Sequence, residues 1–179
     1  MKEIGRYMVK ISTLVAPQVA YNIAREMRGL PNKTLTEATW LRFLKSEHSP
    51  IRIAKYKIAM DIPYWVAMHF RTHWVGIEHY ISTSRTDITK QPRDVNRLVH
   101  HVMICNPQSI ISMSRKRLCY KASTETRQVM EAIRRAMLNV DNPLYRAMLP
   151  DCEYRKGCYE LKSCGWYTRC CKERLHDLP

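Results

Sequence analysis

The segment 122–138 constrains the fold more than any other part of the chain, because its apolar residues recur every three or four positions. This spacing places them along one side of an α-helix. Asn142 and Pro143 follow, and a proline in that position stops a helix. The sequence therefore predicts one long helix with a single packing side, made of Thr126, Val129, Met130, Ile133, Met137 and Leu138.

Strand-like segments accompany the helical ones. In residues 51–61 apolar side chains alternate with Arg52, Lys55 and Lys57, and one slip near Ala54 indicates a bulge. We therefore expect an α+β fold in which a mostly antiparallel sheet packs with long helices. The other expected elements are an opening strand or short helix in 2–12, helices over 17–29, from Thr34 or Thr36 to Leu44, 64–70 and 108–119, a polar loop over 86–96, and a strand over 97–104.

Composition narrows the classes of partner. The net charge of +14 favours polyanions, either nucleic acid or phosphate-bearing small molecules. The basic residues are spread along the chain, which favours several anion subsites over one nucleic-acid groove. The chain has only five glycines and no Gly-x-Gly-x-x-Gly pattern, so a Rossmann-type dinucleotide site is not expected. Its apolar runs are too short to cross a membrane or to resemble a signal peptide, and we expect a cytoplasmic protein.

Residues 71–85 are the most concentrated group of chemically active side chains. They combine two arginines, two histidines, a glutamate and several hydroxyl groups directly after an apolar segment. That mixture favours a pocket for an anionic ligand that forms hydrogen bonds, whereas the structural alternative is a polar helix face.

Two blocks within residues 48–138 resemble a known family. The first block is Asp61-Ile62-Pro63-Tyr64-Trp65-Val66-Ala67, which leads into residues 71–85. The second contains Arg115-Lys116-Arg117-Leu118, Ala122, Glu125, Ile133 and Arg135. In both blocks the chain resembles the flavin-dependent thymidylate synthases. The resemblance covers about half of the chain.

The family signature, Arg-His-Arg followed by seven residues and a serine, is altered in this chain. Without a gap, the triplet is Thr72-His73-Trp74 and the serine is Ser82, which loses both arginines. Starting from Arg71, one arginine survives and the serine falls one residue late, and Arg85 fits this register better. The two registers exclude each other, because a shift of one residue turns a side chain toward a different face.

The resemblance implies flavin-dependent methylation of dUMP to dTMP. In that family a methylene group passes from methylenetetrahydrofolate to the pyrimidine, reduced FAD supplies the hydride, and NADPH regenerates the flavin. The resemblance also implies a homotetramer whose active sites are shared between subunits. No protein nucleophile is needed, so the protein's own contribution is to bind, orient and polarise.

The candidate site residues follow from the resemblance and from the chemistry of the ligands. Arg117 is expected to polarise the pyrimidine, and Arg135 and Arg85 to bind its phosphate, because a guanidinium binds phosphate in a bidentate fork. The serines Ser82 and Ser84 are expected to donate hydrogen bonds to the nucleotide. The remaining candidates are Arg71 and His73 for the FAD pyrophosphate, Glu78 or His79 in place of a nucleotide-binding glutamate, and His69 in place of a ring-contacting glutamine.

Structural roles compete with several of these assignments. The alternative for Arg117 and Arg135 is a solvated charge on a helix, but the block around them favours a functional role. For His69 a packed or surface histidine is favoured. His100 and His101 are adjacent on a predicted strand, so their side chains should face opposite ways and a structural role is favoured for them.

The last thirty residues differ in character, so we divide the chain into a domain over 1–149 and a cysteine-rich extension over 150–179. The family core has no equivalent of this extension. Its cysteines recur every six residues without the Cys-x-x-Cys pairs typical of zinc sites. Bound zinc, reduced thiols and an oxidised pair are the three alternatives. The candidate zinc ligands are Cys152, Cys158, Cys164 and Cys170.

Two other functions stay open at this point. In the first, based on the altered triplet, the protein is a divergent nucleotide-binding relative of the family. Such a relative would perform other one-carbon chemistry, such as pyrimidine hydroxymethylation, or would have no activity. The charge and the cysteines motivate a basic nucleic-acid-binding protein with a zinc-stabilised tail.

Overall fold

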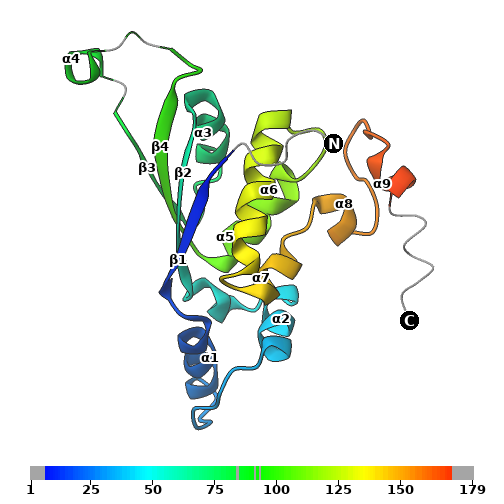
Figure 1. Ribbon diagram of the computed structural model, residues 1–179. Helices are drawn as coiled ribbons and strands as arrows, with labels where there is room; N and C mark the ends of the chain where they lie inside the picture. The colour runs from blue at the N-terminus through cyan, green and yellow to red at the C-terminus, as the bar shows by residue number, and fades with distance from the viewer. Residues whose placement is uncertain (1–6, 84, 91, 93, 171–179) are drawn as a thin grey trace.

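The computed structural model describes residues 7–83, 85–90, 92 and 94–170. Its centre is a four-stranded antiparallel sheet in the order β1-β2-β4-β3. The helices α5 and α6 lie to one side of this sheet, and α1 and α2 lie at one end of it (Figure 1). The strands are β1 (Val9–Val15), β2 (Lys55–Pro63), β3 (Ile77–Ile81) and β4 (Leu98–Cys105). This arrangement confirms the predicted α+β fold with an antiparallel sheet.

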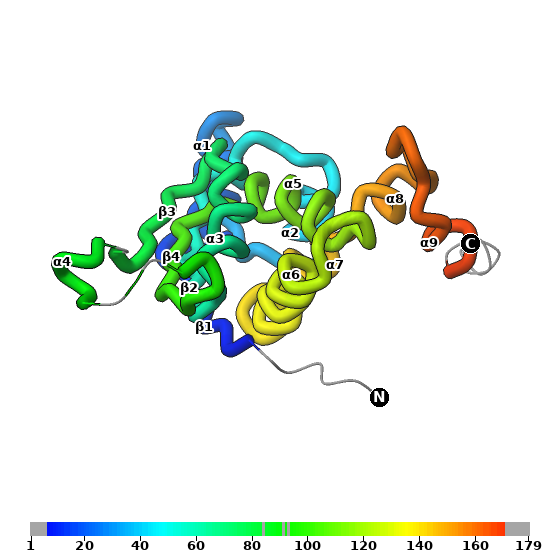
Figure 2. The backbone as a smooth tube through the Cα atoms, turned by 90° about the horizontal axis from the view of Figure 1, so that it is seen from above, coloured from blue at the N-terminus to red at the C-terminus, as the bar shows by residue number. Residues whose placement is uncertain are grey.

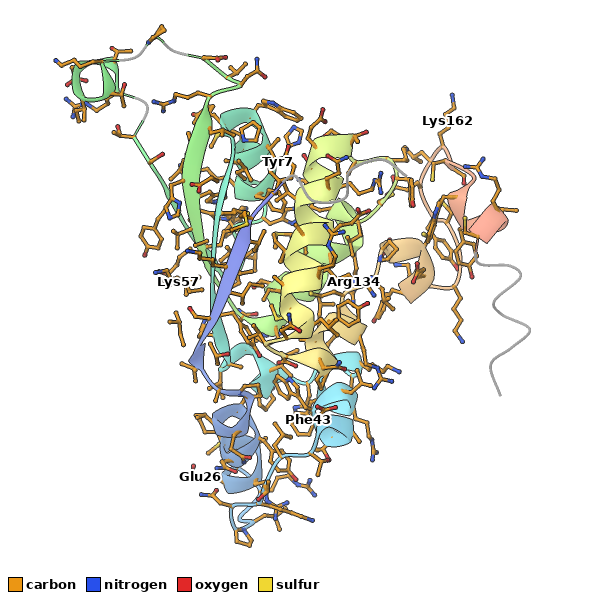
Figure 3. The ribbon with its side chains drawn as sticks, in the orientation of Figure 1. Tyr7, Glu26, Phe43, Lys57, Arg134 and Lys162 are labelled. Atoms are coloured by element: carbon orange, nitrogen blue, oxygen red, sulfur yellow. The ribbon has the colours of Figure 1, made fainter. Side chains whose placement is uncertain are left out.

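Alternation along β2 and β4 divides the sheet into a buried and an open face. Tyr56, Ile58, Met60 and Ile62 are buried, whereas Lys57 and its neighbours on the other face are wholly or partly exposed. Lys57 points away from the helices (Figure 3). In β4 the buried positions are Val99, His101, Met103 and Cys105, so the same rule turns His101 inward and His100 outward.

The helices begin where the sequence supplies capping side chains. Thr36 accepts a hydrogen bond from the Thr39 N–H at the start of α2, and Ser123 accepts one from Thr126 at the start of α6. Asn106 and Ser109 form a capping box at the start of α5. The helices are α1 (Pro17–Glu26), α2 (Glu37–Lys45), α3 (Tyr64–Arg71), α4 (Thr86–Thr89), α5 (Pro107–Arg117), α6 (Thr124–Leu138), α7 (Asn142–Ala147), α8 (Asp151–Tyr154) and α9 (Trp166–Cys170).

A buried carboxylate ties α2, β2 and α7 together within the core. Asp141 accepts hydrogen bonds from the Trp40 indole at 2.8 Å, from the Tyr56 hydroxyl and from the Leu144 N–H at 2.9 Å. These donors satisfy an acidic group that would be costly to bury alone. Burial, followed by the charge of Asp141, raises the pKa of Tyr56 above its ordinary value.

The structure corrects several of the predicted boundaries. The opening strand is Val9–Val15, with residues 2–6 of its predicted range outside the described residues, and the first helix ends at Glu26. The strand expected over 51–61 begins only at Lys55, because Ser49–Arg52 forms a 3₁₀ turn whose Ile51 is fully buried. Pro50 at the start of this turn has no N–H to contribute to a sheet. The polar loop expected over 86–96 contains the short helix α4, which lies at the tip of the β3–β4 hairpin (Figure 1).

Residues 150–170, the described part of the predicted extension, lie beside the α5–α6 end of the rest of the chain, as the view from above shows (Figure 2). The Arg115 guanidinium lies 3.7 Å from the ring centre of Tyr154, and the Tyr120 ring stacks on Trp166 at 4.9 Å. Within the described residues, no helix has the length and apolar character needed to cross a membrane.

Candidate functional site

Hydrogen bonds hold the turn between α3 and β3 against the start of α5. The backbone oxygen of Gly76 accepts hydrogen bonds from the Ser109 hydroxyl at 3.1 Å and from the Asn106 amide at 3.3 Å. Gly76 has a φ of +71°, and a Cβ atom there would come within 2.5 Å of the Asn106 amide nitrogen. Only glycine fits both requirements, so Gly76 determines how closely this turn approaches α5.

Arg117 joins α5 to the C-terminal end of α3. Its Nη2 donates to the backbone oxygen of His69 and to the Thr72 hydroxyl, each at 2.7 Å. The Thr72 hydroxyl in turn donates to the same His69 oxygen at 2.8 Å. A cation in this position is favourable, because the last carbonyls of a helix carry partial negative charge. Arg117 is half-buried, and burial lowers the pKa of its guanidinium.

A chain of histidines continues from this point into the sheet. The His79 ring nitrogen Nε2 lies 2.9 Å from the backbone oxygen of His73, and its Nδ1 lies 3.0 Å from Nε2 of His101. A carbonyl only accepts, so His79 must carry its proton on Nε2. When Nδ1 of His79 accepts from the Nε2–H of His101, Nδ1 of His101 is left as an acceptor. Within the described residues, that buried nitrogen has no hydrogen-bond partner.

The surroundings of His101 and His73 lower the pKa of both imidazoles. Burial, followed by the charges of His79 and His100, lowers the pKa of His101 to about 4. Burial, followed by the charge of Arg117 and then that of His79, lowers the pKa of His73 to about 4. At neutral pH both rings are therefore hydrogen-bonding groups without charge, beside a guanidinium that keeps its charge.

A pocket of about 420 Å³ lies beside this group, between the α3–β3 turn and the start of α5. Its size falls within the range of small-molecule sites. It offers a cation from Arg52, an indole from the 73% exposed Trp74, and the hydroxyls of Thr72, Ser109 and Ser112. His73 also lines it, and among the described residues its Nε2 is buried without a partner. The arrangement can therefore receive an anionic ligand that carries a planar ring.

The structure brings some of the predicted site residues together. His69, His73, His79 and Arg117 all belong to one connected group, which we call the Arg117 cluster: His69, Thr72, His73, His79, His101, Arg117 and Thr126. His69 enters it through Nδ1, which lies 2.9 Å from the Thr126 hydroxyl, while its ring packs edge-on against Trp65.

Other predicted residues lie outside the Arg117 cluster. Glu78 is on the open face of the sheet, where it accepts a hydrogen bond from the Tyr80 hydroxyl at 2.8 Å. The Ser82 hydroxyl accepts from the His100 N–H at 3.1 Å, and Arg85 pairs with Asp87 at 2.5 Å. These residues lead into the hairpin tip, while Ser84 lies outside the described residues. Arg71 lies in the last turn of α3 and Arg135 in the last turn of α6, and both side chains are exposed.

The predicted site residues do not include His101, Thr72 or Arg52, which belong to this region. The strand alternation that separates His101 from His100 also turns His101 inward toward His79. Thr72 stands in the sequence only as part of the altered triplet and Arg52 only in the alternation of a predicted strand, because their roles depend on contacts between distant segments. His100 instead pairs with Asp61 at 2.8 Å on the open face, as the predicted opposite orientation requires.

A second pocket lies between α1 and α2. It has a volume of about 690 Å³, and its lining includes the three arginines Arg25, Arg28 and Arg42. Phe43 lies between these helices (Figure 3), with its ring stacked on His48 at 5.2 Å. The spacing of these residues along the sequence gave no sign of a pocket.

The cysteines of the extension surround a third, much smaller pocket. Cys152, Cys158 and Cys164 line it together with Cys119 of the domain, whereas Cys170 does not. The Ser163 hydroxyl, followed by the Glu160 N–H, lowers the pKa of Cys158. In the described part of the chain, no three His, Cys, Asp or Glu side chains are placed so that they could hold a metal ion. The zinc site stays a prediction.

Comparison with known proteins identifies the fold. No family model and no curated protein matches the sequence. Among solved structures, the chain is similar to the crystal structure of the UMP/dUMP methylase PolB from Streptomyces cacaoi bound with 5-Br dUMP. The TM-score is 0.62 at 10% sequence identity, over 79% of this chain and 94% of that one. The antiparallel sheet with its helices is therefore the fold of that methylase.

Proposed function

We propose that this protein methylates dUMP to dTMP in a flavin-dependent reaction, with methylenetetrahydrofolate as carbon donor and NADPH as reductant. The observation that carries the proposal is the Arg117 cluster beside a ligand-sized pocket, on the fold of a UMP/dUMP methylase. The sequence resemblance to flavin-dependent thymidylate synthases supports the same reaction independently of that fold.

The residues around the 420 Å³ pocket fit part of a flavin nucleotide. Trp74 presents a planar apolar surface, Arg52 a cation, and His73 a buried nitrogen without a partner among the described residues. In the proposal His73 holds FAD from within this pocket, and Arg71 and His79, which do not line it, are the other proposed FAD ligands. Bound flavin would supply the hydride chemistry, which amino-acid side chains cannot perform.

Arg117 is proposed to polarise the pyrimidine. Its Nη2 is used by His69 and Thr72, which fixes the plane of the guanidinium. Its Nε is buried and has no partner within the described residues, so the side chain keeps unused donors. A guanidinium held in place before the reaction stabilises negative charge that develops on the ring.

Of the proposed phosphate ligands, Ser82 and Arg85 lie on the β3–β4 hairpin and Arg135 lies on α6, while Ser84 is outside the described residues. The hairpin tip, where Arg85 precedes α4, points away from α6 (Figure 1), so one copy of the chain holds Arg85 and Arg135 apart. We therefore propose a homotetramer in which the hairpin of one copy completes the site of another. Glu78 on the open sheet face and His69 in the cluster are proposed to contact the nucleotide within such shared sites.

Rescue of a thymidine-requiring bacterial strain tests the proposed function. The unaltered chain should restore growth without thymidine, and Arg117→Ala should not. Arg146→Ala is the matched control, because it removes an equal charge from an exposed position on α7. Growth with Arg117→Ala would contradict the role of Arg117. Failure of the soluble unaltered chain, or accumulation of a hydroxymethylated nucleotide in its place, would contradict the methylation itself.

A further inference from the structure

We propose that Cys119 and Cys158 form a redox-active thiol pair, which reversibly links the domain to its C-terminal extension. The proposal rests on the cysteine-lined pocket and the contacts around it, and is independent of the proposed methylation.

Four thiols from separate parts of the chain meet around one small pocket. Cys119 follows α5, Cys152 belongs to α8, and Cys158 and Cys164 lie in the segment between α8 and α9. The pocket has a volume of about 20 Å³, which is room for about one water molecule. None of the four is in a disulfide, and each is at least partly accessible to solvent. A small oxidant can therefore reach thiols that have other thiols nearby.

The contacts around the pocket favour Cys119 and Cys158 as the pair. Glu160, two residues after Cys158, contacts Lys116 at 3.3 Å and Lys121 at 3.7 Å. These two lysines flank Cys119 in the sequence, so the segment that carries Cys158 lies across the segment that carries Cys119.

Aromatic contacts fix the same two segments. Tyr120, next to Cys119, stacks on Trp166 of α9 at 4.9 Å, and the Arg127 guanidinium lies 4.3 Å from the Tyr120 ring centre. Tyr154 of α8 is held by Arg115 and donates a hydrogen bond to Glu47 at 3.0 Å. The extension is therefore docked on both sides of the pocket, which keeps Cys158 on the same pocket as Cys119.

Thiol chemistry fits this arrangement better than metal binding does. A tetrahedral zinc site needs four ligands about 2.3 Å from the ion, and no three side chains of the described residues are placed to hold one. A disulfide needs only two sulfur atoms to meet. The consequence is local, because Cys119 is two residues from Arg117 and the bond would tie the extension to the end of α5.

The chemistry requires a two-electron oxidant, for which hydrogen peroxide suffices. One thiol attacks a peroxide oxygen, the O–O bond breaks, and sulfenic acid and water form. The second thiol attacks the sulfenic sulfur, the S–O bond breaks, and a second water leaves. Two thiols and one peroxide thus give one disulfide and two waters, and a dithiol reductant reverses the result.

Peptide mapping of the full chain tests the proposal. Reduced protein is treated with hydrogen peroxide, blocked with an alkylating agent, digested without reductant and analysed by mass spectrometry. The expected result is a cross-linked peptide containing Cys119 and Cys158, lighter by two hydrogen atoms and lost after dithiothreitol. Cys119→Ser and Cys158→Ser should each remove it, and Cys170→Ser, outside the pocket, should leave it unchanged.

Three outcomes would overturn the proposal. They are a dominant disulfide between any other pair, no disulfide under peroxide excess, and one zinc ion per chain that co-purifies and protects these thiols. Circular dichroism of each variant separates loss of the link from loss of folding. Alkylation of Cys119 in unaltered protein, measured before and after peroxide, gives the same answer without any substitution. Cys105 serves as an internal reference, because burial raises its thiol pKa to about 12.

Discussion

The stretch 71–85 places its candidate ligands in two different environments. At one end, Thr72, His73 and His79 are tied by hydrogen bonds to Arg117 and His101. At the other end, Ser82 and Arg85 lie exposed where the chain enters the hairpin tip, with partners within the hairpin. The first end is pre-arranged by a single chain, whereas the second has free access to another molecule. Neighbouring residues in one motif can therefore have separate roles, one in organising the site and one in completing it.

The largest effect is expected from Arg117→Ala. The substitution removes two hydrogen bonds from a charged donor and leaves the end of α3 without its cation. Such bonds contribute about 1.5–3 kcal/mol each, so we expect a loss of roughly 3 kcal/mol in the free energy of unfolding. Urea unfolding followed by circular dichroism measures it. Arg117→Lys should recover part of the loss, and equal stability of both variants would mean that the contacts at α3 contribute little.

The next largest effect is expected from acid, which should lower the stability of the folded protein by protonating His101 and His73. The pKa of His101 is about 4 in the folded protein and about 6.5 in an unfolded chain, so the unfolded state binds more protons between these values. Stability should therefore fall as the pH drops from 6.5 toward 4, by about 3 kcal/mol from this fully buried ring. His73 acts in the same direction.

Urea unfolding at several pH values measures this dependence. His101→Gln should reduce the pH dependence to the part that His73 contributes, while His100→Gln, on the open sheet face, should leave it unchanged. An unchanged slope in His101→Gln would contradict the burial of a neutral imidazole in the cluster.

Two glycine substitutions separate the turn geometry from ordinary backbone strain. Gly76→Ala combines a positive φ with a clash against Asn106, whereas Gly29→Ala has a φ of +64° and nothing within 4 Å of its new Cβ. We expect a loss of about 1 kcal/mol for Gly29→Ala and about 2–3 kcal/mol for Gly76→Ala. Thermal unfolding of the two variants checks this order. Equal losses would mean that the turn does not depend on its close approach to α5.

The smallest effect on stability is expected from Arg85→Ala. Its ion pair with Asp87 is exposed on both sides, so the melting temperature should stay within experimental error. If Arg85 binds the nucleotide phosphate, the KM for dUMP should rise at least about tenfold, the effect of losing roughly 1.4 kcal/mol of binding. A KM equal to that of the unaltered chain would remove the hairpin from the binding site.

The regular elements of this protein were predictable because each has a local cause. The apolar stripe of α6, the cap at Thr36 and the alternation in β2 each depend on residues that are close together in the sequence. The start of β2 was placed too early, because alternation extended into residues that Pro50 and the burial of Ile51 draw into a 3₁₀ turn. Local patterns therefore located the elements better than their ends.

The residues of the candidate site were predictable only within the blocks that resemble the family and within the stretch 71–85. Arg117 was expected from its block of residues, and His73 and His79 from the concentrated stretch. The link from His79 to His101 joins residues 22 positions apart, and the link from Arg117 to Thr72 joins residues 45 apart. No local pattern reports such contacts, and the pocket between α1 and α2 escaped for the same reason.

Conversion of dUMP to dTMP by the purified chain tests the proposed methylation most directly. The assay contains FAD, NADPH and methylenetetrahydrofolate, and the nucleotides are separated and identified by mass. We expect dTMP to form only when all three are present, together with a flavin spectrum that NADPH bleaches. Folded protein that retained no FAD and formed no dTMP would contradict the proposed flavin-dependent methylation.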